Sequence, residues 1–160
     1  MTGFQVMKKS SFYFIGMKWS GTYEAAAHGD ILPTIQHSQE RLKELGLVNA
    51  ESDLIGLSYH DRTDGFTYFI GTEARNAPSI PSDMHGIIVP SHEYAITEHE
   101  GQHAWKSYEK LYSWVENKGY QLHQYGLDHL DVYPMDYDPY KMSPTLTIGV
   151  PIKKRAQSID

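Results

Sequence analysis

The predicted secondary-structure elements of this chain occur twice in the same order, and this repetition limits the fold more than any other sequence feature. Each series has a β run, an amphipathic helix and two β runs that can pair as a hairpin. The helices start near residues 31 and 102, and the hairpins near 54 and 129. The halves share no residue-level identity, so the repetition rests on element order. We predict an α+β fold of duplicated βαββ units with pseudo-twofold symmetry around a central ligand cleft.

The first series contains one clear helix. Residues 12–17 are rich in aromatic and β-forming side chains and predict a strand. An apolar stripe at helical spacing then ends at Gly46, a residue suited to a left-handed stop, and Asp30 is the expected N-cap. Residues 54–59 and 66–71 flank a polar turn at Asp64 and Gly65, which is typical of a hairpin. The stripe consists of Ile31, Ile35, Leu42 and Leu45.

The second series repeats this order. Residues 87–90 and 94–97 predict a broken strand, and a helical stripe follows that ends with Lys118 and Gly119. Residues 130–133 and 145–152 can form a second hairpin, in which Pro151 is expected at an edge or terminal position. The stripe consists of Ala104, Tyr108, Leu111 and Val115.

Length and composition place the chain among folded single domains. We predict one domain over residues 1–160, with repeat 1 at about 10–76, a linker at about 77–84 and repeat 2 at about 85–153. The absence of cysteine excludes disulfides and thiolate sites. No segment approaches the ~20 apolar residues of a membrane span, so we expect a cytoplasmic protein without membrane contact. The net charge of −6 argues against direct nucleic-acid binding and suits neutral or cationic partners.

A set of short motifs resembles one known family over nearly the whole chain. The motifs are 55–57 (IGL), 66–71 (FTYFIG), 88–90 (IVP), Tyr94, Ala95, Gly101, Trp105, Tyr112, Trp114, Val115, Gly119, Tyr120, 130–134 (LDVYP) and 148–151 (IGVP). In this order they resemble the GyrI-like small-molecule-binding family, which shares a superfamily with the effector-binding domains of bacterial multidrug-responsive transcription activators. The resemblance implies a duplicated βαββ fold whose halves enclose an aromatic-lined cleft.

The resemblance also implies a buried carboxylate in the second repeat that meets the charge of lipophilic cations. Many relatives have Glu there, two residues before a Tyr, whereas this chain has the shorter Asp131 followed by Tyr133. A carboxylate among apolar neighbours needs a partner, which a bound cation, an internal donor or a proton could supply. An exposed Asp at the start of a strand is the alternative.

Aromatic side chains are the other candidate ligand contacts. Trp105, Tyr108 and Tyr112 share one side of the second helix, by the i, i+3, i+4 rule. Such rings can make cation–π contacts, although a helical aromatic stripe is more often core packing. Glu98 lies at the preceding junction and is a candidate second acidic contact or general base. The remaining candidates are Tyr59, Tyr68 and Tyr133.

We predict no metal and no cofactor. His99, Glu100 and His103 match the H-E-x-x-H pattern of zinc proteases, but Gly101 interrupts the required helix and no third ligand follows. We expect this stretch to be a strand-to-helix junction. The polar groups at 128–129 and 136–138 are interpreted as solvated loop residues.

The expected function is that of a stand-alone binding protein, a sensor or sequestering protein for hydrophobic and often cationic small molecules. The first predicted strand starts near residue 11, which leaves no room for a helix-turn-helix, so a regulatory role would need an unidentified protein partner. Two alternatives stay open. One is a hydrolase that opens cyclopropane-bearing genotoxic compounds with Asp131, Glu98 and Tyr133. The other is a protein-interaction role such as gyrase inhibition.

Overall fold

Nine antiparallel strands and three helices make up the part of the computed structural model that is described, residues 3–49, 51–75, 79–101, 103–123, 126–141 and 145–155. The strands form one sheet in the order β1-β6-β9-β8-β3-β4-β2-β5, with β7 paired to β9. This confirms the predicted α+β class. In chain order the elements are β1 (Gln5–Lys9), β2 (Phe12–Thr22), α1 (Tyr23–Ala27), α2 (Leu32–Glu44), β3 (Asp53–Tyr59), β4 (Gly65–Ala74), β5 (His85–Val89), β6 (His92–Glu100), α3 (Ala104–Asn117), β7 (Tyr120–Leu122), β8 (His129–Pro134) and β9 (Thr145–Lys154).

The two series of elements are joined by an exchange of short strands. Strand β1 leads into β2 but pairs with β6, with Met7 opposite Tyr94. Strand β5 leads into β6 but pairs with β2, with Ile87 opposite Phe14. Each series therefore adds an edge strand to the other, while β3 and β8 pair at the centre of the sheet. The pseudo-twofold axis itself stays a prediction.

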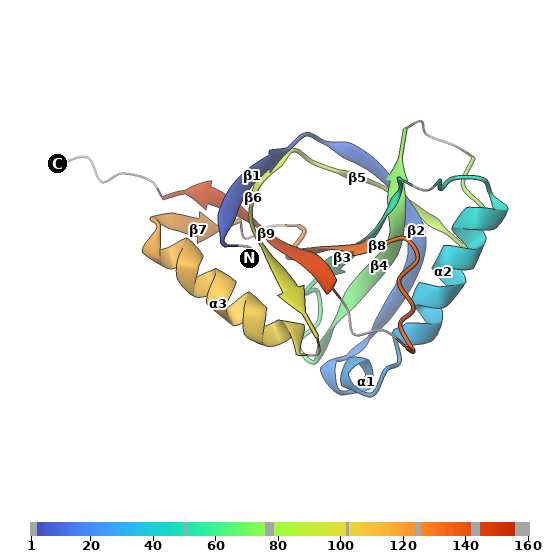
Figure 1. The fold of residues 1–160 in the computed structure, drawn as a ribbon, viewed down its shortest axis with the longest axis horizontal. Helices are drawn as coiled ribbons and strands as arrows, with labels where there is room; N and C mark the ends of the chain where they lie inside the picture. The colour runs from blue at the N-terminus through green and yellow to red at the C-terminus, as the bar shows by residue number, and fades with distance from the viewer. Residues whose placement is uncertain are drawn as a thin grey trace.

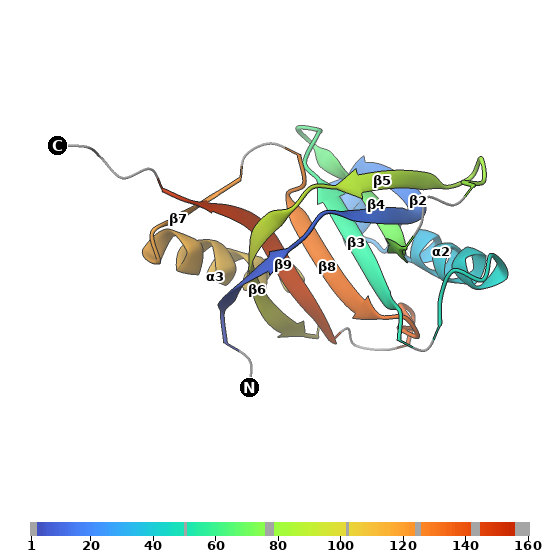
Figure 2. The same ribbon diagram turned by 90° about the horizontal axis from the view of Figure 1, so that it is seen from above.

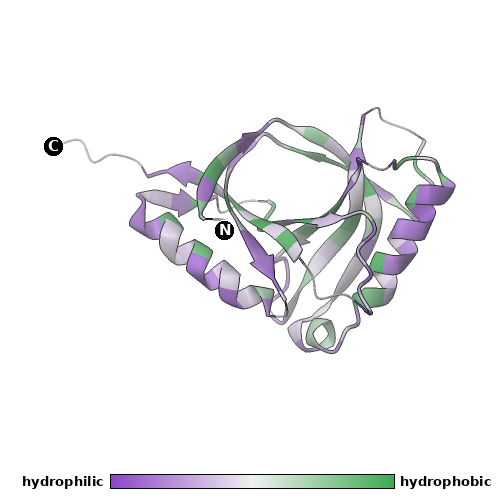
Figure 3. Cartoon of the chain, in the orientation of Figure 1, coloured by the Kyte–Doolittle hydropathy of each residue, from purple (hydrophilic) through white to green (hydrophobic). Residues whose placement is uncertain are grey.

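The sheet is curled, and its two faces have different roles (Figure 1). Strands β1 and β5 close over one face, where residues of β2, β3, β5, β6 and β8 form an apolar core. The helices lie against the other face, with α2 and α3 at opposite ends (Figures 1 and 2). Helix α3 packs on one group of strand residues and α1 with α2 on another. In Figure 3 hydrophobic residues follow the strands, whereas α2 is largely hydrophilic on its outward side.

Both long helices form where the apolar stripes predict them, and their stops are confirmed. Gly46 and Gly119 adopt positive φ angles of 68° and 82° after α2 and α3, the conformation that glycine tolerates best. The expected cap of α2 is wrong. Ile31 is the N-cap without a side-chain hydrogen bond. Asp30 instead accepts a hydrogen bond of 2.9 Å from Nε1 of Trp19, because a buried indole N–H needs an acceptor.

The first hairpin and the pairing of β8 with β9 are confirmed. Three short elements, β1, α1 and β7, were not predicted, because five residues or fewer are too short for a periodic pattern. Pro151 lies in an interior strand, contrary to expectation, at the point where the partner of β9 changes from β8 to β7. Its carbonyl accepts from the backbone N of His123, and no ladder partner is needed for its missing N–H.

None of the helices in the described segments is long and apolar enough to cross a membrane.

Candidate functional site

A cavity of about 480 Å³ lies between the two helical layers, over the central strands. Helices α1 and α2 form one wall, α3 forms the other, and β3, β4 and β8 form the floor. The lining residues are Tyr23, Ala26, Ile31, Leu32, Ile35, Ser58, His60, Phe66, Tyr68, Ala104, Trp105, Tyr108, Glu109, Tyr112, His129, Asp131, Tyr133 and Tyr137.

The floor of the cavity is fixed by strand register and by one glycine. Asp131 of β8 lies opposite Gly56 of β3, and Tyr68 of β4 lies opposite Ser58 of β3. The Tyr68 hydroxyl reaches across β3 to Oδ2 of Asp131, at 3.4 Å. A Cβ atom at Gly56 would lie 1.9 Å from that hydroxyl oxygen. Glycine at this position therefore leaves the space through which Tyr68 contacts Asp131.

Asp131 is a half-buried carboxylate held by tyrosine hydroxyls. Tyr108 of α3 donates a hydrogen bond to Oδ1, and Tyr68 donates to Oδ2. Burial raises the pKa of Asp131 from 3.8 to about 6, and the two hydrogen bonds only partly oppose that increase. At neutral pH the cavity therefore contains an anion whose desolvation is only partly offset.

The surrounding tyrosines remain protonated donors. Burial raises the pKa of Tyr68, Tyr108 and Tyr133 well above 10, and the negative charge of Asp131 raises each further. These hydroxyls can hold the carboxylate, but they carry no positive charge. Among the lining residues, all within the described ranges, there is no Lys or Arg.

The α3 wall joins a tyrosine pair to a half-buried histidine of β8. The ring of Tyr108 stacks on that of His129, with centroids 3.8 Å apart and planes inclined by 13°. The Tyr112 hydroxyl hydrogen-bonds with Nε2 of His129. Burial, together with the nearby His60, lowers the pKa of His129 to about 3. His129 is therefore neutral at physiological pH.

The part of the cavity lining nearer to α1 and α2 is aromatic, and the segment after β8 is tied to α2. Tyr133 stacks on Tyr137 with centroids 4.8 Å apart. Gln39 of α2 donates to the backbone carbonyls of Tyr137 (2.6 Å) and Met135 (3.0 Å), which fixes the segment after β8. Phe66 lies edge-on to Tyr68, with centroids 6.3 Å apart. These aromatic side chains line the cavity together.

One polar side chain on the floor has no partner. Ser58 is 6% exposed and lines the cavity, and its hydroxyl makes no hydrogen bond to any residue that the structure describes. It lies directly opposite His129, so the two side chains are neighbours on the same face of the sheet.

The structure brings together most of the site residues predicted from the sequence. Tyr68, Tyr108, Tyr112, Asp131 and Tyr133 converge on the cavity, and Trp105 lies at its rim with 56% of its surface exposed.

Two predicted site residues lie elsewhere. Tyr59 packs edge-on against Phe69 on the opposite face of the sheet, in the core beneath β1 and β5. Glu98 is exposed on β6, on the face away from α3, because its neighbour His99 points toward that helix.

Sequence reasoning missed several cavity residues. His129 and Tyr137 were interpreted as solvated loop residues, which is wrong, since His129 belongs to β8 and Tyr137 is 8% exposed. Ser58 and His60 were not singled out either. The alternation His129-Asp131-Tyr133 along one strand was the available signal, because residues two apart share one face of a sheet.

The predicted strand-to-helix junction is confirmed. Both ring nitrogens of His99 make hydrogen bonds at this junction. Nδ1 is bonded to Ser107 Oγ (2.7 Å), and Nε2 is bonded to the carbonyl of Gly101 (3.0 Å). His103 is the N-cap of α3 with φ 65°, so the two histidines share no helical face. Within the described ranges, no three His, Asp or Glu side chains gather as metal ligands would.

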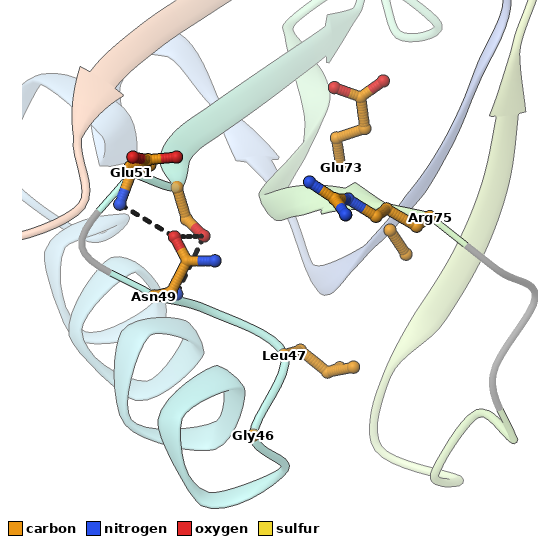
Figure 4. A pocket seen from close by; sticks show the side chains of 8 residues that line it. Gly46, Leu47, Asn49, Glu51, Glu73 and Arg75 are labelled. Atoms are coloured by element: carbon orange, nitrogen blue, oxygen red, sulfur yellow. Dashed lines mark hydrogen bonds between the residues drawn. The ribbon is translucent and has the colours of Figure 1, made fainter.

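A second hollow of about 510 Å³ lies between the end of α2 and the end of β4 (Figure 4). Asn49, Glu51, Glu73 and Arg75 line it and are exposed. Glu73 pairs with Lys9 at 3.6 Å. These are solvated side chains, so this hollow has none of the buried, unpaired chemistry of the central cavity.

Comparison with known proteins identifies similar chains. The family model described as the GyrI-like small molecule binding domain matches residues 4–153. A comparison with curated protein sequences gave no significant match.

Several solved structures are similar to this chain. The EcmrR C-terminal domain has a TM-score of 0.71 and 14% identity, over 97% of this chain and 99% of that one. This chain spans 58% of the EcmrR chain in its DNA complex, at a TM-score of 0.70 and 16% identity over 96% of this chain. SAV2435 bound to tetraphenylphosphonium has a TM-score of 0.67 and 17% identity, over 94% of each chain. A hydrolase encoded by lin2189 from Listeria innocua has a TM-score of 0.58 and 13% identity, over 94% of this chain and 91% of that one. At these identities the similarity establishes the fold alone.

Proposed function

This chain belongs to the family of GyrI-like small molecule binding domains, and from that premise we propose that its cavity binds lipophilic organic cations. The protein would act as a sensor or sequestering protein for such compounds. One observation carries the proposal. The carboxylate of Asp131 is held by neutral hydroxyls in an aromatic cavity whose lining, within the described ranges, contains no Lys or Arg.

The chemistry of that cavity favours a cation over other ligands. A half-buried anion without a positive partner is costly, and a cationic ligand offsets that cost when it binds. Tyrosine and tryptophan rings contribute cation–π attraction of roughly 0.5–2 kcal/mol each when the charge is desolvated. Glu109 on α3 adds a second acidic group at the exposed side of the lining. An anionic ligand would meet only repulsion. The similar fold of SAV2435, solved with tetraphenylphosphonium, supports the same ligand class.

A pair of ions with the same shape and opposite charge tests this proposal. Tetraphenylphosphonium and tetraphenylborate are titrated separately into the protein, with tryptophan fluorescence and calorimetric heat as readouts. We expect the phosphonium to bind at about micromolar affinity, since aromatic pockets that accept many ligand shapes bind each ligand only moderately tightly. Its binding should quench the fluorescence of Trp105, while the borate should not bind. Equal binding of the two ions, or no binding of the phosphonium, would reject the proposal.

Hydrolysis is a second candidate function, favoured by the pKa of Asp131. A carboxylate with a pKa of about 6 can exchange a proton near neutral pH. Neighbouring tyrosine hydroxyls could stabilise a developing enolate. Because Glu98 lies on the other face of the sheet, these roles would fall to Asp131 with Tyr108, Tyr68 or Tyr133. Product analysis with a cyclopropane substrate is the test. Turnover that disappears in Asp131→Asn would support the hydrolase, and an unchanged substrate would exclude it.

A further inference from the structure

We propose that the cavity is built for a two-part ligand, a lipophilic cation that carries a neutral hydroxyl or carbonyl group about 7 Å from its charge, and that Ser58 with His129 binds this neutral group. The inference rests on the proposed function, because the cationic part is assigned to Asp131. It adds a second contact that determines which cations fit.

Ser58 is the observation that carries the inference. Its oxygen is open to the cavity, because the fully buried side-chain polar atom without a partner in the described ranges is the Tyr94 hydroxyl and not that of Ser58. A ligand that covers the Ser58 hydroxyl without giving it a hydrogen bond loses free energy, since native proteins satisfy the great majority of buried polar groups. Ser58 is 6% exposed, lines the cavity and has no side-chain partner among the described residues. The Tyr68 hydroxyl, on the neighbouring strand, is directed to Asp131 and not to Ser58. The space above Ser58 therefore lacks a polar group that a ligand can supply.

His129 lies beside Ser58 and completes the subsite. The two residues are directly opposite one another on β8 and β3. Nε2 of His129 is used by Tyr112, and the ring is fixed by stacking on Tyr108. Nδ1 of His129 makes no hydrogen bond to the residues that the structure describes. A ligand oxygen placed between Ser58 and His129 can therefore meet both side chains.

The charge of this subsite selects a neutral group. His129 is neutral because burial lowers its pKa to about 3, and Ser58 carries no charge. A carboxylate or phosphate would find no positive partner there and would be repelled by Asp131. A hydroxyl or carbonyl needs no such partner.

Strand geometry sets the spacing of the two parts. His129 and Asp131 are two residues apart on the same face of β8, and two residues of a strand span about 7 Å. Ser58 and Asp131 are diagonal neighbours across the β3–β8 pair, a separation of about 7 Å. The two parts of the ligand should be separated by a similar distance, which one aromatic ring can provide.

Two probes that differ only in a hydroxyl test the inference. The first is phenethyltrimethylammonium, and the second is its 4-hydroxy derivative, with the phenolic oxygen at the far end of the ring from the ammonium. Affinities are measured by calorimetry for the wild-type chain, Ser58→Ala, Tyr59→Phe and Asp131→Asn. Tyr59→Phe is the matched control, because it removes a hydroxyl from the next residue of β3 on the opposite face of the sheet.

The wild-type chain should prefer the hydroxylated probe by about five- to tenfold, the range expected for one hydrogen bond to a buried group. Ser58→Ala should abolish that preference, leave the affinity for the plain probe unchanged, and keep or raise the melting temperature. Tyr59→Phe should keep the preference for the hydroxylated probe. Asp131→Asn should weaken the binding of both probes by the same factor.

Each contrary outcome has a distinct meaning. Equal affinities of the wild-type chain for the two probes, or a preference that survives in Ser58→Ala, would overturn the second subsite and leave cation binding intact. A lower melting temperature of Ser58→Ala would show that its hydroxyl already has a partner, which also overturns the inference. If neither probe binds to the wild-type chain, the proposed function itself fails, and the inference fails with it.

Discussion

Asp131 shows how a single residue can cost stability and provide binding at the same site. Its folded-state pKa of about 6 is above the ordinary 3.8, so between these values the folded chain holds a proton that the unfolded chain has lost. Stability therefore falls as pH rises from 3.8 to 6, and the full cost is present above pH 6. The difference between these two pKa values corresponds to at most about 3 kcal/mol of folding free energy.

The substitution Asp131→Asn should therefore stabilise the free protein at pH 7 by about 1–3 kcal/mol. The gain should largely disappear at about pH 3, below both pKa values, where the carboxyl is protonated in both states. Denaturant unfolding of the two proteins at about pH 7 and about pH 3 measures the difference. A variant that is less stable than wild type at both values would show that Asp131 has a structural ion-pair or capping role.

The contact between Tyr68 and Asp131 depends on the missing side chain of Gly56. Gly56→Ala would place a methyl group 1.9 Å from the Tyr68 hydroxyl oxygen, so the ring must move away from the carboxylate. We expect a loss of stability of about 1–3 kcal/mol, as for other overpacked cores, together with weaker cation binding. Gly149→Ala is the control, since its nearest contact would be a side-chain methyl at 3.2 Å. Equal effects of the two substitutions on binding would contradict this role for Gly56.

At the scale of elements, α3 is positioned by the junction that precedes it. His99 near the end of β6 uses both ring nitrogens at this junction, one bonded to Ser107 in the first turn of α3 and the other to the carbonyl of Gly101 before the helix. The same helix carries Trp105, Tyr108 and Tyr112 to the cavity. The first histidine of the H-E-x-x-H pattern therefore has a structural role through its hydrogen bonds.

Zinc should consequently have no effect on this junction. Treatment with a chelator, or addition of zinc, should leave the melting temperature unchanged, because His99 has no ring nitrogen to offer a metal. Ser107→Ala should lower the free energy of unfolding by about 1–2 kcal/mol, since one nitrogen of a buried histidine loses its partner. Scanning calorimetry of both proteins with and without chelator is the measurement. A stoichiometric zinc that is lost in His103→Ala would contradict this account.

The elements that the sequence predicts are those with long periodic patterns. The stripes from Ile35 to Leu42 and from Tyr108 to Val115 lie on buried helix faces, so periodicity locates them. Strand β1 is short, and its partner β6 is distant in the chain, so its pairing depends on tertiary contacts that periodicity does not contain. The same is true of β7, which β9 holds in place.

At the scale of the whole molecule, the cavity exists because two helical layers cover one face of a shared sheet. The predicted cleft between two units correctly located five tyrosine and aspartate candidates in one cavity. The same prediction misplaced Tyr59 and Glu98, because the face on which a strand residue lies depends on the pairing register, and a shift of one residue moves it to the other face. Ser58 and His129 were missed for the same reason, since only the pairing of β3 with β8 shows that they face one another.

The central claim is that an ionised Asp131 binds the positive charge of a ligand, and the pH dependence of tetraphenylphosphonium affinity tests it most directly. With a pKa of about 6, the carboxylate is nearly fully ionised at pH 7.5 and about one-tenth ionised at pH 5. The account predicts wild-type affinity about tenfold weaker at pH 5 than at pH 7.5, because only the ionised fraction binds the cation well. Asp131→Asn should bind about ten- to a hundredfold more weakly than wild type at pH 7.5 and show no change between the two pH values. Wild-type affinity that is equal at both pH values, or an Asp131→Asn variant that binds as tightly as wild type, would contradict it.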